Sequence, residues 1–143
     1  MKIESILNKI IVYVYSDELL KCDIKDTIKR IIGSLKKYYK LDILGSYNIK
    51  LFMNDKYGYI IEIIKNDNYI KENIIKINLN ILKDSLILYE VEDPLDYINN
   101  EIYYYDNKFY INLVEKDVNI MENSNLIYSN SAYKIIGRGI KIN

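Results

Sequence analysis

Residues 23–40, with the sequence DIKDTIKRIIGSLKKYYK, carry the clearest structural pattern in this chain. Their apolar side chains recur at helical spacing and occupy an arc of about 120°, the stripe expected of a helix that lies on a sheet. Asp23 is a suitable N-cap, because its carboxylate can accept hydrogen bonds from the free backbone N–H groups of the first turn. The pattern predicts one long amphipathic helix whose apolar face contains Ile24, Ile28, Ile31, Ile32, Leu35, Tyr38 and Tyr39.

Alternating or continuous apolar segments on both sides of this helix predict strands. Ile10–Tyr15 is β-branched and aromatic, which is typical of a strand buried on both faces, and the residues before it fit either more strand or a short helix. After the helix, pairs of apolar segments around turn residues predict three hairpins: 47–53 with 59–64, 74–82 with 86–91, and 102–105 with 109–114. Residues 126–128 and 133–142 predict one or two further strands, and residues 117–125 are a weak candidate for a second helix.

This order of elements favours an α+β fold. One main amphipathic helix, at about residues 23–40, is expected to pack on a mostly antiparallel sheet built from successive hairpins. The opening elements fit a β-α-β-β arrangement. At 143 residues the chain has the length of one domain, so we expect a single α+β domain over residues 1–143.

The composition argues against most catalytic sites. The chain has no histidine and no tryptophan, one cysteine and sixteen tyrosines, so every site that depends on histidine is excluded. We therefore expect no catalytic residues, no cofactor and no metal, and a non-enzymatic protein is favoured over an enzyme. Eighteen lysines against two arginines indicate an A/T-rich, low-GC genome. The lone Cys22 cannot form an internal disulfide and no apolar run reaches roughly 20 residues, which predicts a cytoplasmic protein without a membrane partner.

Four lysines of the predicted helix form one stripe beside its apolar arc: Lys25, Lys29, Lys36 and Lys40. A lysine stripe that ends at two tyrosines could follow a phosphate backbone while the tyrosine rings stack on bases. The alternative is a solvated helix face whose lysine stems cover the edge of the core, and this interpretation is favoured. The scarcity of arginine also argues against a dedicated nucleic-acid binder.

Residues 84–101 contain six acidic side chains and no basic one. Within them Glu90, Glu92, Asp93 and Asp96 are close in sequence, so they could hold a divalent cation or form an acid–base pair. That combination would make the protein a carboxylate- and metal-dependent hydrolase. No calcium-loop pattern is present, so an acidic surface that meets a basic partner or the helix of another copy is favoured over a metal site. A merely solvated acidic loop is favoured over both.

Aromatic side chains are concentrated on one predicted hairpin, at Tyr103, Tyr104, Tyr105, Phe109 and Tyr110. Successive residues of a strand point to opposite faces, so Tyr104 is expected on the other side of the sheet from its two neighbours. The tyrosines either form cross-strand pairs in the core or contribute to a protein interface, where tyrosine is enriched. The predicted interface combines these four tyrosines with Glu90, Glu92 and Asp93.

Taken together, the sequence favours a small protein-binding or self-assembly module. Its surface would act through an exposed sheet face or edge, surface tyrosines and opposed charge. Residues 1–71 hold thirteen basic against nine acidic side chains, whereas residues 72–143 hold seven against eleven. The expected partner is another protein or further copies of the chain in a homo-oligomer. Nucleic-acid binding through the lysine stripe and the metal-dependent hydrolase remain as alternatives.

Overall fold

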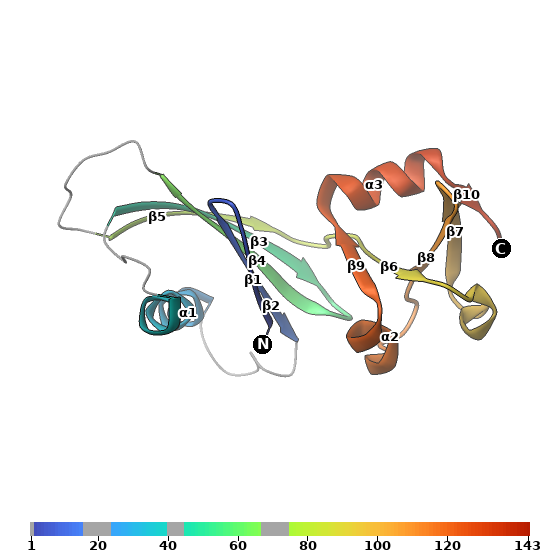
Figure 1. Cartoon of the computed structure of the whole chain (residues 1–143), viewed down its shortest axis with the longest axis horizontal. Helices are drawn as coiled ribbons and strands as arrows, with labels where there is room; N and C mark the ends of the chain where they lie inside the picture. Colours follow the sequence, from blue (N-terminus) through green and yellow to red (C-terminus); the bar gives the residue numbers. More distant parts are fainter. Residues whose placement is uncertain (1, 16–23, 40–44, 67–74) are drawn as a thin grey trace. The chain divides into compact units, whose positions relative to one another are not determined.

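A computed structural model describes residues 2–15, 24–39, 45–66 and 75–143 of the chain (Figure 1). The chain divides into two compact units: unit 1 comprises Met1–Met53 and Gly58–Leu82, and unit 2 comprises Asn54–Tyr57 and Lys83–Asn143. Each unit has a five-stranded sheet and its own buried core. The mixed α+β class is therefore confirmed. Whether the two units behave as the single domain expected from the length stays a prediction.

The sheet of unit 1 has the strand order β1-β2-β4-β3-β5. Its elements are β1 (Lys2–Ile6), β2 (Lys9–Tyr15), α1 (Ile24–Tyr39), β3 (Gly45–Asn54), β4 (Gly58–Asn66) and β5 (Ile75–Leu82). The pairs β1–β2 and β2–β4 are antiparallel, whereas β3 and β5 are parallel, with Gly45 opposite Ile75. The residues whose strand or helix character was left open, 2–6, form β1.

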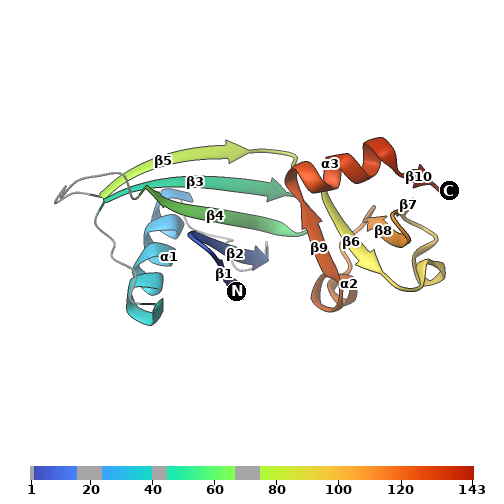
Figure 2. The ribbon, with the colours of Figure 1, turned by 45° about the horizontal axis from the view of Figure 1, so that its top comes forward.

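Helix α1 crosses one face of this sheet (Figure 2). Ile28, Ile31 and Ile32 are buried, because their i, i+3 and i+4 spacing places them on one side of the helix. They pack against alternate residues of the strands, which point to the same face. These strand residues are Ile10, Val12, Val14, Tyr47, Ile49, Leu51, Ile61 and Ile63.

The sheet of unit 2 is antiparallel throughout, with the order β10-β7-β8-β6-β9. Its strands are β6 (Ile87–Val91), β7 (Glu101–Tyr105), β8 (Lys108–Asn112), β9 (Asn125–Tyr128) and β10 (Ile140–Lys141). Its helices are η2 (Pro94–Tyr97), α2 (Val118–Asn123) and α3 (Ser129–Arg138). The β7–β8 turn consists of Asp106 and Asn107, with φ of 50° and 63°. Two successive positive φ angles match the twist of a tight hairpin, and Asp and Asn tolerate them better than most residues.

Helix α3 covers one face of this sheet. Its buried residues Ala132 and Ile135 pack with Leu88, Tyr103 and Tyr110, which point to that face from three adjacent strands. The opposite face of these strands is buried at Tyr89, Ile102 and Ile111. Towards the β7–β8 turn the same face becomes partly exposed.

Two sequence-based expectations were wrong. Residues 74–82 and 86–91 do not form a hairpin, because β5 pairs with β3 in unit 1, whereas β6 pairs with β8 and β9 in unit 2. Residues 133–142 are not one strand, since α3 extends to Arg138 and only Ile140–Lys141 is extended and paired. The expected single main helix is accompanied by α2, for which Asp117 serves as N-cap, and by α3.

The turn that joins β3 to β4 belongs to unit 2, although both strands belong to unit 1. The Asn54 side chain fixes this turn by accepting hydrogen bonds at Oδ1 from the backbone N–H groups of Lys56 (3.0 Å) and Tyr57 (2.9 Å). Its Nδ2 donates to the carbonyl oxygen of Ser85 at 2.9 Å. Tyr57 is 4% exposed, so its side chain is part of the packed interior, whereas Asp55 of the same turn is exposed.

Candidate functional site

Four apolar side chains form a continuous row on the face of the unit 2 sheet that α3 does not cover. Val91 of β6 lies opposite Phe109 of β8, Phe109 opposite Tyr104 of β7, and Tyr104 opposite Ile140 of β10. Neighbouring strands are about 4.8 Å apart, so this apolar row extends for roughly 15 Å. Ile140 is 66% exposed and the other three are half-buried. The apolar row is therefore a surface rather than a core.

The centre of the apolar row is aromatic. The rings of Tyr104 and Phe109 have their centroids 5.2 Å apart with an interplanar angle of 52°. The Tyr104 hydroxyl donates a hydrogen bond to Oδ1 of Asn107 at 3.0 Å, which fixes the orientation of its ring. The two rings are thus held in place, so a partner would not have to order them on binding.

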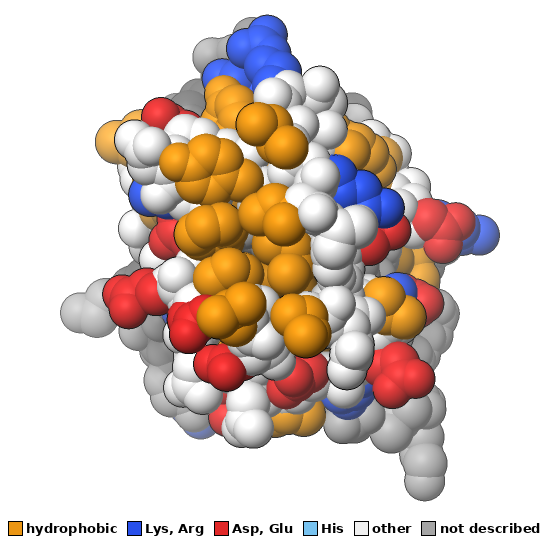
Figure 3. All heavy atoms as spheres, turned by 90° about the vertical axis from the view of Figure 1, so that its right-hand side faces the viewer, with side chains coloured by type: hydrophobic (Ala, Val, Ile, Leu, Met, Phe, Trp, Pro, Cys, Tyr) orange, Lys and Arg blue, Asp and Glu red, His pale blue; other side chains and the backbone are white. Residues whose placement is uncertain are grey.

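Further exposed apolar side chains belong to segments next to these strands: Leu95 of η2 is 73% exposed, Ile98 59% and Ile142 52%. The backbone N–H of Ile142 donates to the carbonyl of Ile102, and Nδ2 of Asn143 donates to the carbonyl of Ile98 at 3.1 Å. These bonds connect the C-terminal segment to residues 98–102. Figure 3, viewed from the side on which β10 lies, shows hydrophobic side chains in a continuous band with acidic groups along its lower border.

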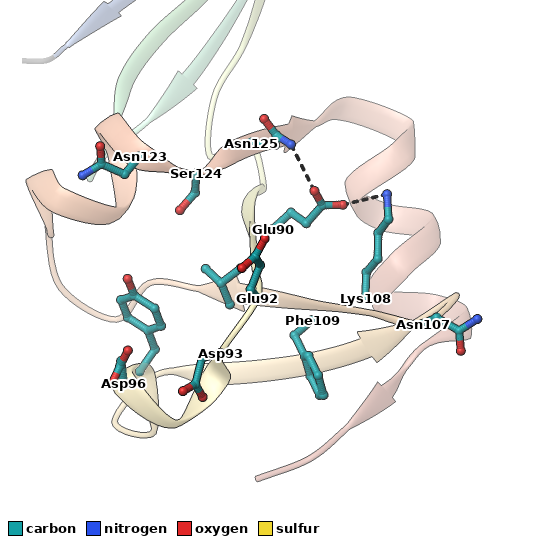
Figure 4. Close-up of a pocket in the computed structure, with 12 residues that line it drawn as sticks. Glu90, Glu92, Asp93, Asp96, Asn107, Lys108, Phe109, Asn123, Ser124 and Asn125 are labelled. Atoms are coloured by element: carbon teal, nitrogen blue, oxygen red, sulfur yellow. Dashed lines mark hydrogen bonds and ion pairs between the residues drawn. The ribbon is translucent and has the colours of Figure 1, made fainter.

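A polar pocket of about 690 Å³ adjoins the apolar row, because Val91 and Phe109 belong to both (Figure 4). It is open to solvent, and it brings together all four acidic residues that the sequence singled out. The remaining lining residues are mostly polar. The complete lining is Glu90, Val91, Glu92, Asp93, Asp96, Tyr97, Asn107, Lys108, Phe109, Asn123, Ser124 and Asn125.

Glu90 is held by two partners from adjacent strands. Nδ2 of Asn125 donates to its Oε2 at 3.0 Å, and Nζ of Lys108 lies 3.0 Å from its Oε1. The hydrogen bond from Asn125 is the main cause that holds the pKa of Glu90 below its ordinary value, and the hydrogen bond from Lys108 is the second. The contact between Lys108 and Glu90 also raises the pKa of Lys108. Glu90 is therefore an ionised side chain that braces the sheet, with little capacity left for a ligand.

The other three acidic residues are exposed. Asp93 N-caps η2, accepting a hydrogen bond from the backbone N–H of Leu95 at 2.9 Å. Glu92 and Asp96 make no ion pair or side-chain hydrogen bond with the part of the chain that the structure describes. These two carboxylates are consequently the ones available to a partner with basic side chains.

The pocket does not assemble a metal centre. Within residues 2–15, 24–39, 45–66 and 75–143, no three acidic or cysteine side chains are grouped so that they could hold a metal ion. Glu90 is already neutralised by Lys108, and Asp93 caps a helix. The geometry thus adds no support for a metal-dependent hydrolase.

The four tyrosines of the predicted interface lie in different environments. Tyr103 is 8% and Tyr110 6% exposed beneath α3, and desolvation is the main cause that raises the pKa of both hydroxyls. Tyr105 is half-buried at the edge of the same core. Tyr104 points to the opposite face, as the alternation of the strand predicted, and lies in the apolar row. Of the four, Tyr104 is therefore the best placed to contact a partner.

Only part of the predicted lysine stripe can be placed. Lys29 and Lys36 are exposed on α1. Lys40 and the side chain of Lys25 lie outside the described residues. Nucleic-acid binding through this stripe stays a prediction.

The sequence did not identify Val91, Leu95 and Ile140 as site residues. It placed Phe109 in the aromatic hairpin but not in the predicted interface. The signal was present in part, because Ile140 and Ile142 alternate with Lys141. It could not be interpreted without the pairing of β10 with β7, which brings residue 140 next to residue 104.

No helix in the described part of the chain is long and apolar enough to cross a membrane. Comparison with known proteins gives no family to which the chain can be assigned. No protein-family model, no curated protein and no solved structure matches it.

Proposed function

We propose that the protein is a small, non-enzymatic interaction module that binds a protein partner through the apolar row of unit 2 and the acidic residues beside it. The observation that carries this proposal is the in-register alignment of Val91, Phe109, Tyr104 and Ile140 at the partly exposed end of a sheet face. Proteins that act as monomers rarely expose large contiguous apolar surface, and such surface commonly marks a site of association.

The composition of the surface supports the same conclusion. Interface centres are enriched in aromatic residues and depleted of charge, whereas their rims are polar. Here Tyr104 and Phe109 lie at the centre, and Glu92 and Asp96 lie in the pocket next to Val91. The partner surface that fits is apolar, with basic side chains at one border.

The test is retention of a partner from the source cell by the immobilised full-length chain. Leu95→Asp and Ile140→Asp each place a charge on the exposed apolar surface, so we expect each to abolish specific retention while thermal unfolding stays unchanged. Val118→Asp is the matched control, because Val118 is also an exposed aliphatic residue (50%) but belongs to α2. Retention that is equal for all four proteins, or no specific retention by the wild type, would contradict the proposal.

A further inference from the structure

The two ends of the apolar row carry opposite charge. At the β6 end, Val91 is followed directly by Glu92 and Asp93. At the β10 end, Ile140 lies between Arg138 and Lys141. All four charged residues are exposed, and neither Glu92 nor Arg138 makes an ion pair with another described residue. Lys141 lies opposite Tyr103, so its side chain points to the face that α3 covers, where its Nζ is 3.7 Å from Oε1 of Glu101. Arg138, the last residue of α3, is therefore the basic residue left for the β10 end of the apolar row.

A surface that is acidic at one end, apolar in the middle and basic at the other is complementary to itself after rotation by 180°. We propose that the apolar row is the contact surface of a twofold-symmetric dimer of this chain, in which two rows lie on each other in opposite directions. The acidic end of each copy then meets the basic end of the other. The dimer contains two equivalent Glu92–Arg138 contacts, one on each side of the axis.

The centre of the row suits the position of the twofold axis. Tyr104 and Phe109 are the two middle residues, so their rings from both copies meet at the axis, where interface side chains are most completely desolvated. The charged ends remain at the rim. There, charge governs orientation and specificity more than affinity.

The net charge of the chain also favours association between identical copies. Twenty basic and twenty acidic side chains give a formal net charge of zero, so two copies approach without overall repulsion. A partner with a different sequence would have to reproduce both charged ends in the right order, whereas a second copy does so by symmetry. The inference rests on the proposed function, since it uses the same surface and names its occupant.

The size of the surface sets the expected affinity. Four strands at about 4.8 Å spacing give a face roughly 20 Å wide. Even with Leu95 and Ile142 at its border, a face of this width buries less area per partner than the ~800 Å² of a standard stable interface. We therefore expect a reversible dimer with a dissociation constant in the micromolar range, on the order of 10 μM.

Sedimentation velocity of the full-length chain from about 1 to 100 μM tests this dimer. Glu92→Lys and Arg138→Glu each turn two attractive contacts into repulsive ones, so each should raise the dissociation constant about tenfold. The double variant should return to within about threefold of the wild type, because the swapped charges attract again. Lys50→Glu and Glu122→Lys are matched controls: both residues are exposed, on β3 and α2, and reversal should leave the dimer unchanged.

Tyr104→Ser provides a second measurement that does not depend on charge, and it should abolish the dimer. Thermal unfolding of every variant at low concentration separates loss of association from loss of folding. A chain that stays monomeric over the whole range overturns the inference, and so does a dimer whose single charge variants are not rescued by the double variant.

The two proposals fail separately. The wild type could stay monomeric but retain a different protein, and Leu95→Asp and Ile140→Asp could each abolish that retention. In that case the interaction module stands and the dimer is wrong. If the chain neither dimerises nor retains a partner, both are wrong.

Discussion

Glu90 illustrates how one residue can look like a catalytic candidate and act as a structural brace. In sequence it belongs to the acidic segment 84–101, which contains no basic side chain that could pair with it. The antiparallel sheet brings Lys108 from β8 and Asn125 from β9 to it from opposite sides. Partners that are 18 and 35 residues away cannot be predicted from spacing, because they depend on which strands pair.

The depressed pKa of Glu90 predicts a specific pH dependence of stability. A carboxyl group whose pKa is lower in the folded than in the unfolded chain stabilises the fold above its unfolded pKa, and this contribution is lost as the pH falls through the folded pKa. Its ordinary value is 4.5, so the Glu90 contribution should be complete at neutral pH and should fade below about pH 4.5.

We therefore expect Glu90→Gln to lower the urea midpoint at neutral pH and to approach the wild type at about pH 3. Glu122→Gln serves as the control, because Glu122 is exposed on α2 and should not change the midpoint at either pH. A midpoint difference for Glu90→Gln that is equally large in acid would show that its ionisation is not the cause.

Alternation along β7 shows what can be predicted at the scale of single residues and what cannot. The sequence predicted that Tyr104 points away from Tyr103 and Tyr105, and the register confirms it. Which residue of the second face stays at the surface could not be derived, because Ile102 and Tyr104 are both apolar, yet Ile102 is buried and Tyr104 is only half-buried. On the first face, Tyr103 is covered by α3, which begins 24 residues after the end of β7.

Among the elements, α1 was predictable and α2 was a weak candidate, whereas α3 was not predicted as a helix. Over residues 23–40 the 3.6-residue period repeats for several turns, so α1 was located nearly to its ends. In α3 the adjacent Ile135 and Ile136 fit a strand as well as a helix, and Gly137 has a low helix propensity. Likewise, Lys83–Ser85 resembles a hairpin turn locally, but the strands on its two sides pair with other partners.

The two glycines at the end of α3 should respond oppositely to alanine. A Cβ on Gly137 would have no neighbour within 4 Å, whereas a Cβ on Gly139 would lie 2.5 Å from the Ile135 carbonyl oxygen and 3.1 Å from that of Tyr104. Gly137→Ala should thus stabilise the protein by up to about 1 kcal/mol through helix propensity. Gly139→Ala should destabilise it by about 1–3 kcal/mol, because backbone atoms cannot easily move away.

Urea unfolding of these two variants measures both effects. Gly33→Ala in α1 is a useful reference, since its Cβ would also find open space and should give a gain similar to that of Gly137→Ala. Equal effects at positions 137 and 139 would show that the close approach of residue 139 to β7 is not present in solution.

At the scale of the whole molecule, the division into two sheets is the feature that the sequence did not show. Both sheets consist of short strands of similar composition, rich in isoleucine and tyrosine, so local pattern does not indicate which strand joins which sheet. The total strand content and the mixed class follow from the alternation. The strand order does not, because it is decided by contacts between distant segments.

The β3–β4 turn predicts that the two units unfold together. Since Asn54–Tyr57 packs within unit 2 while β3 and β4 belong to unit 1, loss of either unit should disturb the other. Ile31→Ala, in the core of unit 1, and Ile135→Ala, in that of unit 2, should each cost about 2–4 kcal/mol. Both should shift one common transition, seen at the same urea concentration by circular dichroism and by tyrosine fluorescence.

Lys36→Ala, at an exposed position of α1, should leave that transition within about 0.5 kcal/mol of the wild type. Two resolved transitions, each shifted by only one of the core variants, would show that the units are separate domains and that the single domain expected from the length is wrong.

The same turn limits how this protein can have exchanged parts during evolution. A gene fragment encoding residues 83–143 would carry every strand and helix of the second sheet but neither Tyr57 nor the amide of Asn54 that binds the Ser85 carbonyl. If that fragment were transferred alone into another gene, the encoded unit would lack the Tyr57 side chain in its interior. We therefore expect the two halves to be inherited as one piece, and recombination to be tolerated at neither of their boundaries.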